Sequence, residues 1–169
     1  MDGYLFSLNL WYIKDKTPLS FEKDLLLLSS ELESLKKNNC KMIKLKIDAA
    51  KENIFLMIIR DNDIYSITHE NSKTNYEKLM ILINRFLNSN DFKIKDISTL
   101  YVNIGPGSFA GIRNSISTIK AISLVMKVDY YCYSFNYFKG IKEIKYENIP
   151  NLCDKFSIKK NLINPVYIS

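Results

Sequence analysis

The spacing of apolar residues becomes strand-like near residue 42. Residues 43–48 alternate apolar and polar positions, residues 54–59 form a continuous apolar run, and residues 64–68 resume after a polar turn. Alternation with a period of two is typical of a strand with one buried face. Three such segments, separated by short polar turns, predict an antiparallel meander of three strands.

The following segments switch between helical and strand-like patterns. Apolar residues recur on one helical face over residues 75–87, and Ile81 lies off that face. Residues 108–127 predict a second helix, rich in small residues, between strand-like segments at 99–104 and 130–133. The order of three strands, helix, strand, helix, strand predicts an α/β fold. We expect a mixed sheet with flanking helices, of the ribonuclease-H-like or actin-like ATPase type.

The two ends of the chain have patterns of their own. Residues 1–41 contain a leucine stripe with helical spacing, which predicts a helix that either docks on its own domain or binds a partner. The stripe consists of Leu25, Leu28, Leu32 and Leu35. Residues 139–169 are rich in Lys and Asn and weakly periodic. We therefore divide the chain into an N-terminal extension (1–41), a main domain (42–138) and a short tail (139–169).

Composition narrows the classes of function. The 169 residues are 47% hydrophobic and carry a net charge of +6 that is spread along the chain, which favours a folded domain without a dedicated nucleic-acid groove. The single histidine, His69, excludes sites that need two imidazoles, and three separated cysteines indicate neither a disulfide framework nor a zinc site. We expect a soluble, cytoplasmic protein with no membrane span and no metal site.

A glycine-containing turn follows the strand at 99–104. The turn could hold an anion through backbone amides, or it could serve only a tight strand-to-helix junction. Its spacing, G-x-G-x-x-x-G, differs from the dinucleotide fingerprint, and proline supplies no amide. Both readings stay open at this point. The candidate residues of the turn are Gly105, Pro106, Gly107, Ser108, Gly111 and Arg113.

Taken as a whole, residues 103–113 (N-I-G-P-G-S-F-A-G-I-R) resemble the TsaB family of bacterial tRNA threonylcarbamoyladenosine biosynthesis proteins. That family has G-P-G-S-F-T-G-[VIL]-R here, so only Ala110 departs. Residues 47–50 (I-D-A-A) and 74–79 (T-N-Y-E-K-L) match the family patterns I-D-T-[SA] and T-H-S-E-K-L in part. The resemblance covers residues 42–138.

The chain also departs from the family. Residues 1–41 have no counterpart, so they are either an accessory element or the product of a misassigned start. The tail at 139–169 is a short remnant of the family's second domain. The interdomain cleft that holds ATP in catalytic relatives therefore cannot form from this chain alone. The metal-binding H-x-x-x-H of the catalytic paralogue, TsaD, is missing as well.

The resemblance implies a noncatalytic subunit of the complex that forms N6-threonylcarbamoyladenosine at position 37 of tRNA. It implies binding to TsaD through the two helices, with the TsaE ATPase in the larger complex and tRNA contacted indirectly. ATP and metal would then be bound by the catalytic partner, this chain would hold no cofactor and no catalytic residue, and a homodimer could form in isolation. The predicted partner interface is Leu79, Ile83, Ile116 and Lys120.

Two alternatives remain. One is a small nucleotide-binding enzyme of the actin-like or sugar-kinase superfamily, in which Asp48, at the end of the first strand, would organise Mg²⁺ and the turn at 105–108 would hold phosphate. In a noncatalytic protein Asp48 would be a vestige of that position. The other is a homodimeric remnant that has kept the helical interface without the modification role.

Overall fold

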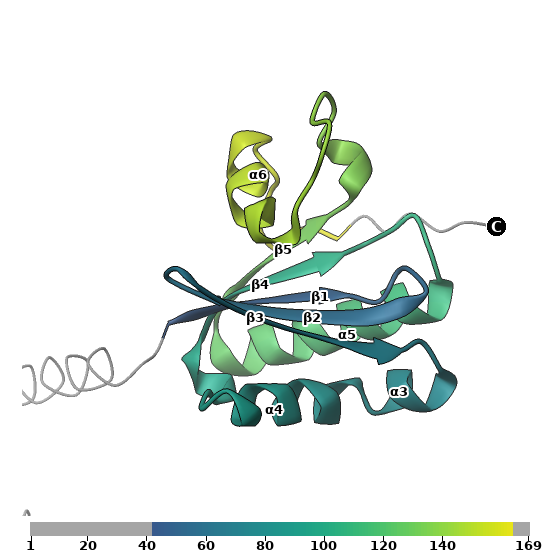
Figure 1. The fold of residues 1–169 in the computed structure, drawn as a ribbon, viewed down its shortest axis with the longest axis vertical. Helices are drawn as coiled ribbons and strands as arrows, with labels where there is room; N and C mark the ends of the chain where they lie inside the picture. Colours follow the sequence, from purple (N-terminus) through teal and green to yellow (C-terminus); the bar gives the residue numbers. More distant parts are fainter. Residues whose placement is uncertain (1–41, 164–169) are drawn as a thin grey trace, which may run out of the picture. The chain divides into compact units, whose positions relative to one another are not determined.

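The computed structural model describes residues 42–163 (Figure 1). The leucine-striped helix predicted within residues 1–41 lies outside the described residues, as do residues 164–169. Five strands form one sheet in the order β3-β2-β1-β4-β5. The strands are β1 (Ile43–Asp48), β2 (Asn53–Arg60), β3 (Asp63–Glu70), β4 (Ile97–Asn103) and β5 (Asp129–Tyr133).

The sheet is mixed, as the element order predicts. Strands β1, β2 and β3 pair antiparallel, which confirms the meander, whereas β4 pairs parallel with both β1 and β5. Asp61, in the tight turn between β2 and β3, has a φ of 50°, a left-handed conformation that Asp tolerates better than most residues.

The two predicted helices are present, and the first of them is interrupted, so three helices are observed at these positions. The predicted helix 75–87 is divided at Lys78 into α3 (Lys73–Glu77) and α4 (Leu79–Ser89). The side chain of Ser72 caps α3 by accepting a hydrogen bond from the Asn75 amide at 3.3 Å. Helix α5 (Phe109–Met126) agrees with the prediction to within a residue at each end.

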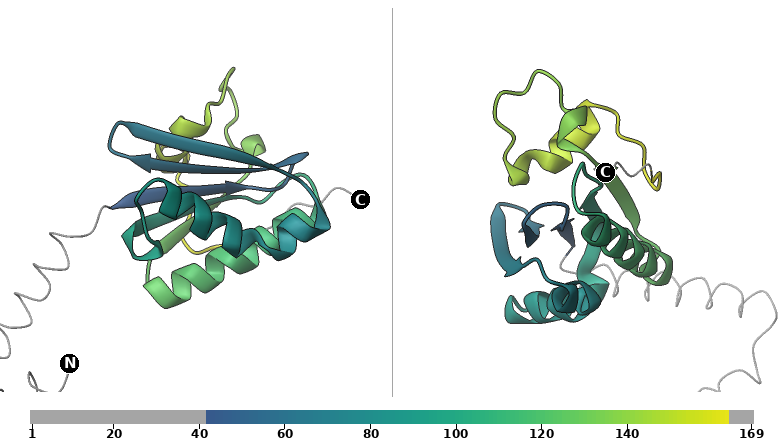
Figure 2. Two further views of the ribbon diagram at one scale, coloured as in Figure 1. Left: turned by 60° about the horizontal axis from the view of Figure 1, so that its bottom comes forward. Right: turned by 90° about the vertical axis from the view of Figure 1, so that its right-hand side faces the viewer.

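The helices α3, α4 and α5 cover one face of the sheet (Figures 1 and 2). Alternate residues of β1, Leu45 and Ile47 among them, pack there against Ile83 of α4 and Ile119 of α5 in the main core. Because successive strand residues point to opposite faces, the residues between them face the other side. This arrangement confirms a mixed sheet with flanking helices.

Part of the opposite face, over β4 and β5, is covered by residues 135–158. Short 3-10 turns η2 (Phe135–Tyr137) and η3 (Tyr146–Asn148) lead into α6 (Ile149–Lys155), and a further turn, η1 (Ile94–Asp96), precedes β4. A second core lies beneath the tail. It consists of Tyr101, Tyr133, Phe138, Ile149, Leu152 and Cys153.

Residues 160 and 161 of the tail lie along the outer edge of β5. The Asn161 amide donates to the Tyr130 carbonyl at 2.9 Å, and Lys160 pairs with Tyr131 in an isolated bridge. Lys160 also forms an ion pair with Asp129 at 2.9 Å. These contacts protect part of an edge that would otherwise expose unpaired backbone groups.

Candidate functional site

The glycine turn at 105–108 lies against the connection between β1 and β2. A Cβ atom on Gly107 would lie 1.9 Å from the Ala50 carbonyl oxygen, and one on Gly111 would lie 1.8 Å from the Ala49 oxygen. No side chain fits at such distances. Both glycines are therefore required for close approach of the turn and of α5 to this connection.

Two backbone donors of the turn are engaged within the protein. The Ser108 amide donates to the Ala50 carbonyl at 2.8 Å, and the Gly105 amide donates to Asn103 Oδ1 at 3.0 Å. Ser108 Oγ accepts from the Gly111 amide at 3.3 Å and thereby caps α5. These hydrogen bonds favour the structural interpretation of the turn over an anion site.

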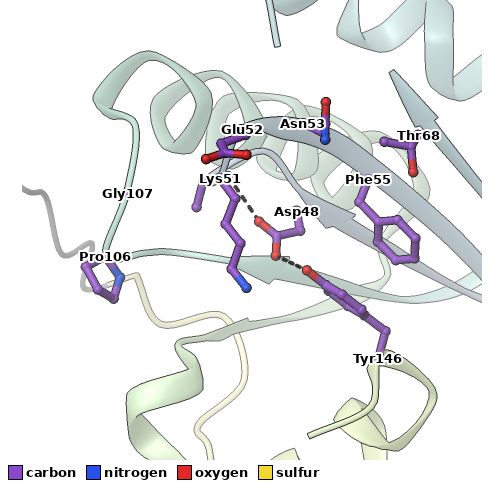
Figure 3. Close-up of a pocket in the computed structure, with 10 residues that line it drawn as sticks. Asp48, Lys51, Glu52, Asn53, Phe55, Thr68, Pro106, Gly107 and Tyr146 are labelled. Carbon is purple, nitrogen blue, oxygen red and sulfur yellow. Dashed lines mark hydrogen bonds between the residues drawn. The ribbon is translucent and has the colours of Figure 1, made fainter. Parts of the chain in front are cut away.

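Asp48 lies at the carboxyl end of β1, 1% exposed. Its Oδ1 accepts from the Ala50 amide at 3.1 Å, and its Oδ2 accepts from Asn103 Nδ2 at 2.9 Å. The same Oδ2 accepts from the Tyr146 hydroxyl at 2.6 Å (Figure 3). The carboxylate thus ties β1 to β4 and to the tail. Among residues 42–163, no group of three or more His, Cys, Asp or Glu side chains is arranged to hold a metal ion.

Lys46 precedes Asp48 by two residues on the same face of β1. It is 0% exposed, although the alternation of residues 43–48 resembles a strand with a solvated lysine face. Its ammonium group donates to the Tyr146 carbonyl and lies 3.9 Å from Met57 Sδ. Burial lowers the pKa of Lys46 from 10.5 to about 7, and Glu147 offsets part of this effect.

Tyr146 completes this arrangement, and sequence reasoning missed it. Burial and the neighbouring Asp48 carboxylate both raise the pKa of its phenol. Its position in a Lys- and Asn-rich stretch gives no local sign of a contact with a residue 98 positions away. The only available signal is that an aromatic residue interrupts a polar segment.

A pocket of about 630 Å³ opens beside Asp48 and Tyr146 (Figure 3). Its other walls include Lys51, Phe55 and Gly107, so it lies between the β1–β2 connection, β2 and the glycine turn. The Lys51 ammonium group also lies 4.5 Å from the centre of the Phe135 ring. The pocket therefore combines a buried carboxylate, an accessible cation and aromatic surface.

The four predicted interface residues differ in how far they are exposed. Leu79 and Ile83 are 1% and 0% exposed and belong to the main core, so their side chains are not available to a partner. Ile116 is half-buried against the same core, and Lys120 is exposed. The apolar stripe of α4 that is visible in the sequence is the stripe that packs on the sheet.

Other apolar residues of the same helices face outward. We call this set the helical face. It consists of Met80 and Ile81 of α4 and Phe109, Leu124 and Val125 of α5, with exposed fractions between 39% and 82%. On α5, Phe109, Lys120 and Leu124 share one side of the helix by their spacing. Exposed Arg113 lies on that side too, with its guanidinium carbon 6.0 Å from the centre of the Phe109 ring.

Comparison with known proteins agrees with this architecture. The family model described as TsaD, tRNA N6-adenosine threonylcarbamoyltransferase, matches residues 66–134, which include the glycine turn. The tRNA threonylcarbamoyladenosine biosynthesis protein TsaB of Buchnera aphidicola subsp. Schizaphis graminum is 29% identical over 86 residues. The chain is similar to TsaB over these 86 residues, which are 51% of this chain and 41% of the relative. The chain therefore spans less than half the length of that protein.

Solved structures show the same fold. YeaZ from Pseudomonas aeruginosa superposes on this chain with a TM-score of 0.52 at 15% identity, covering 55% of this chain and 44% of YeaZ. A second crystal structure, of an uncharacterized protein described as similar to peptidase YeaZ from the same organism, gives the same TM-score and identity and is covered to 43%. The predicted ribonuclease-H-like α/β fold is confirmed.

Proposed function

We propose that this chain takes part in the formation of N6-threonylcarbamoyladenosine at position 37 of tRNA, as a noncatalytic subunit that binds a TsaD-type catalytic subunit. The proposal is supported by the TsaB of Buchnera aphidicola, whose name assigns it to this biosynthesis. In the proposed complex, ATP and metal are held by the catalytic subunit. A TsaE-type ATPase and tRNA reach this chain through that subunit, in the cytoplasm.

The observation that carries the proposal is the helical face. Leu124 and Val125 are 82% and 76% exposed, although α5 already packs its inner side on the sheet. Full burial of one such side chain contributes about 1.5–3 kcal/mol, so several of them provide a strong driving force for association. Lys120 and Arg113 add charge beside this apolar surface. Such a surface suits helices of a partner protein.

The geometry around Asp48 supports a noncatalytic role. The Asp48 carboxylate is surrounded by donors from its own chain, and two amides of the glycine turn are engaged by Asn103 and Ala50. Nucleotide chemistry of the actin-like kind needs a strand-end carboxylate and backbone amides that face the ligand. Here both sets of groups stabilise the junction of β1, β4 and α5.

Co-purification tests the proposal. The wild-type chain, co-expressed with the TsaD-type protein of the same genome, is expected to co-purify with it. Leu124→Glu places a charge in the helical face and is expected to reduce the recovered partner at least about tenfold, because a buried unpaired charge is costly. No co-purification of the wild type would contradict the partner role, and undiminished binding of Leu124→Glu would contradict the assignment of the helical face.

Ile64→Glu is the matched control. Ile64 is 46% exposed, and strand alternation places it on the face of β3 opposite Tyr65, which packs against the main core. The control introduces the same charge at a similarly exposed apolar site away from the helical face. We expect it to bind the partner like the wild type.

A nucleotide-dependent enzyme is the second candidate, and the pocket beside Asp48 is the observation that favours it. Calorimetry of the isolated chain with ATP and Mg²⁺ separates the candidates, since micromolar binding would favour the enzyme. A homodimeric remnant would use the same helical face. Light scattering at several concentrations, on the wild type and on Leu124→Glu, detects it.

A further inference from the structure

The first part of the tail crosses the sheet face opposite α4 and α5. We call residues 139–148 the strap. Most of its residues are exposed, and it contains no regular structure before η3. Gly140 has a φ of 83°, and a Cβ atom there would meet nothing within 4 Å, so the strap begins in open space. Ile141 and Ile144 are half-buried against the second core.

The polar contacts of the strap with the sheet converge on Tyr146. Its hydroxyl donates to Asp48 Oδ2 at 2.6 Å, and its carbonyl accepts from the Lys46 ammonium group. Its ring lies 4.3 Å from the ring of Phe55 and 5.6 Å from that of Phe135, measured between centres. One residue thus engages two charged side chains of β1 and two aromatic rings.

Lys46 depends on this contact more than Asp48 does. Asp48 keeps hydrogen bonds from Ala50 and Asn103 if Tyr146 leaves. Within the described residues, the acceptors of the Lys46 ammonium group are the Tyr146 carbonyl and the sulfur of Met57, which is a weak acceptor. A buried ammonium group without a strong acceptor is unfavourable, so Lys46 is either held by the strap or hydrated.

We propose that residues 139–148 form a strap that opens and closes over the sheet, with Tyr146 as its latch, and that opening exposes Lys46 and Asp48 and enlarges the adjoining pocket. The surface under the latch is charged, so water can replace the contacts of Tyr146 when the strap lifts. The pocket already reaches Asp48 and Tyr146, so opening joins an existing hollow to the newly exposed groups. Local openings of this kind occur well below the free energy of global unfolding.

Competitive acylation of lysines on the full chain tests the proposal. Acetic anhydride at neutral pH is followed by mass spectrometry, with exposed Lys44 as the internal reference on the same strand. In the wild type, Lys46 is expected to react much more slowly than Lys44. Tyr146→Phe removes the hydroxyl that bonds to Asp48, and it is expected to raise the Lys46 rate about tenfold, the effect of losing a hydrogen bond to a charged group.

Tyr137→Phe is the matched control, because it removes a hydroxyl from the neighbouring turn η2 and leaves the latch intact. It is expected to leave the Lys46 rate unchanged. Hydrogen exchange on the same samples distinguishes local from global opening. We expect Tyr146→Phe to accelerate exchange in the strap and not in β1 or β4. An unchanged Lys46 rate in Tyr146→Phe, or faster exchange throughout the sheet, would overturn the proposal.

Discussion

Replacement of Lys46 by methionine is predicted to abolish a pH dependence of stability. The folded protein holds the pKa of Lys46 at about 7, against 10.5 for an accessible lysine, because burial disfavours the ammonium form. Folding therefore releases a proton above pH 7, and stability rises with pH between about 7 and 10.5. Below about pH 7 both the folded and the unfolded protein keep the Lys46 proton, so burial of the ammonium group lowers the free energy of unfolding by its full amount. The other charged or titratable groups that act on Lys46 are Glu147, Cys153 and Lys44.

The magnitude follows from the two pKa values. Each pKa unit corresponds to about 1.4 kcal/mol. Folded Lys46 is half protonated at pH 7, so its loss of the proton raises the free energy of unfolding by about 1.5 kcal/mol between pH 7 and 8.5. Burial raises the pKa of the Cys132 and Cys153 thiols to about 12, and burial together with the Asp48 carboxylate raises the pKa of the Tyr146 phenol above its usual value. These groups therefore stay neutral in the folded protein over this interval.

Urea unfolding of the full chain at pH 7 and 8.5 measures the effect. The wild type is expected to gain about 1.5 kcal/mol relative to Lys46→Met over the interval, because titrations common to both proteins cancel in the difference. The buried stem of Lys46 is close in size to methionine, which limits changes in packing. Equal pH slopes for the two proteins would refute the conclusion that burial of the Lys46 ammonium group penalises folding.

Two further predictions concern the junction at the glycine turn. Gly107→Ala is expected to destabilise the protein by about 2 kcal/mol or more in thermal unfolding, because the new Cβ would collide with the Ala50 carbonyl; an unchanged melting temperature would contradict the close approach. Asn103→Ala is expected to cost about 2 kcal/mol, because buried Asp48 loses a donor; a cost no greater than that of the exposed control Ser117→Ala would contradict the structural role of Asn103.

The order of strands and helices could be predicted from the sequence because local periodicity determines it. The alternation in residues 43–48 and the helical spacing in 75–87 both report which side of an element is apolar. The break at Lys78 was not predicted, because the apolar pattern continues across it. Residue boundaries elsewhere differ by one or two positions, as expected where element ends depend on capping.

The candidate site was predictable only in part, for two physical reasons. Periodicity identifies an apolar stripe without saying what covers it. The sequence therefore predicts Leu79 and Ile83 at the interface, although both are buried, whereas Ile81, which lies off the stripe, is exposed. The burial of Lys46 depends on Tyr146, which approaches from the far end of the chain. No local pattern encodes a contact at that separation, and the lysine therefore resembled a solvated residue.

Nucleoside analysis of tRNA after deletion of the coding gene tests the central claim most directly. Hydrolysed tRNA from the deletion strain, and from strains complemented with the wild type or with Leu124→Glu, is analysed by mass spectrometry. We predict that N6-threonylcarbamoyladenosine is lost on deletion, restored by the wild type and not restored by Leu124→Glu. Undiminished N6-threonylcarbamoyladenosine in the deletion strain would contradict the proposed role in tRNA modification.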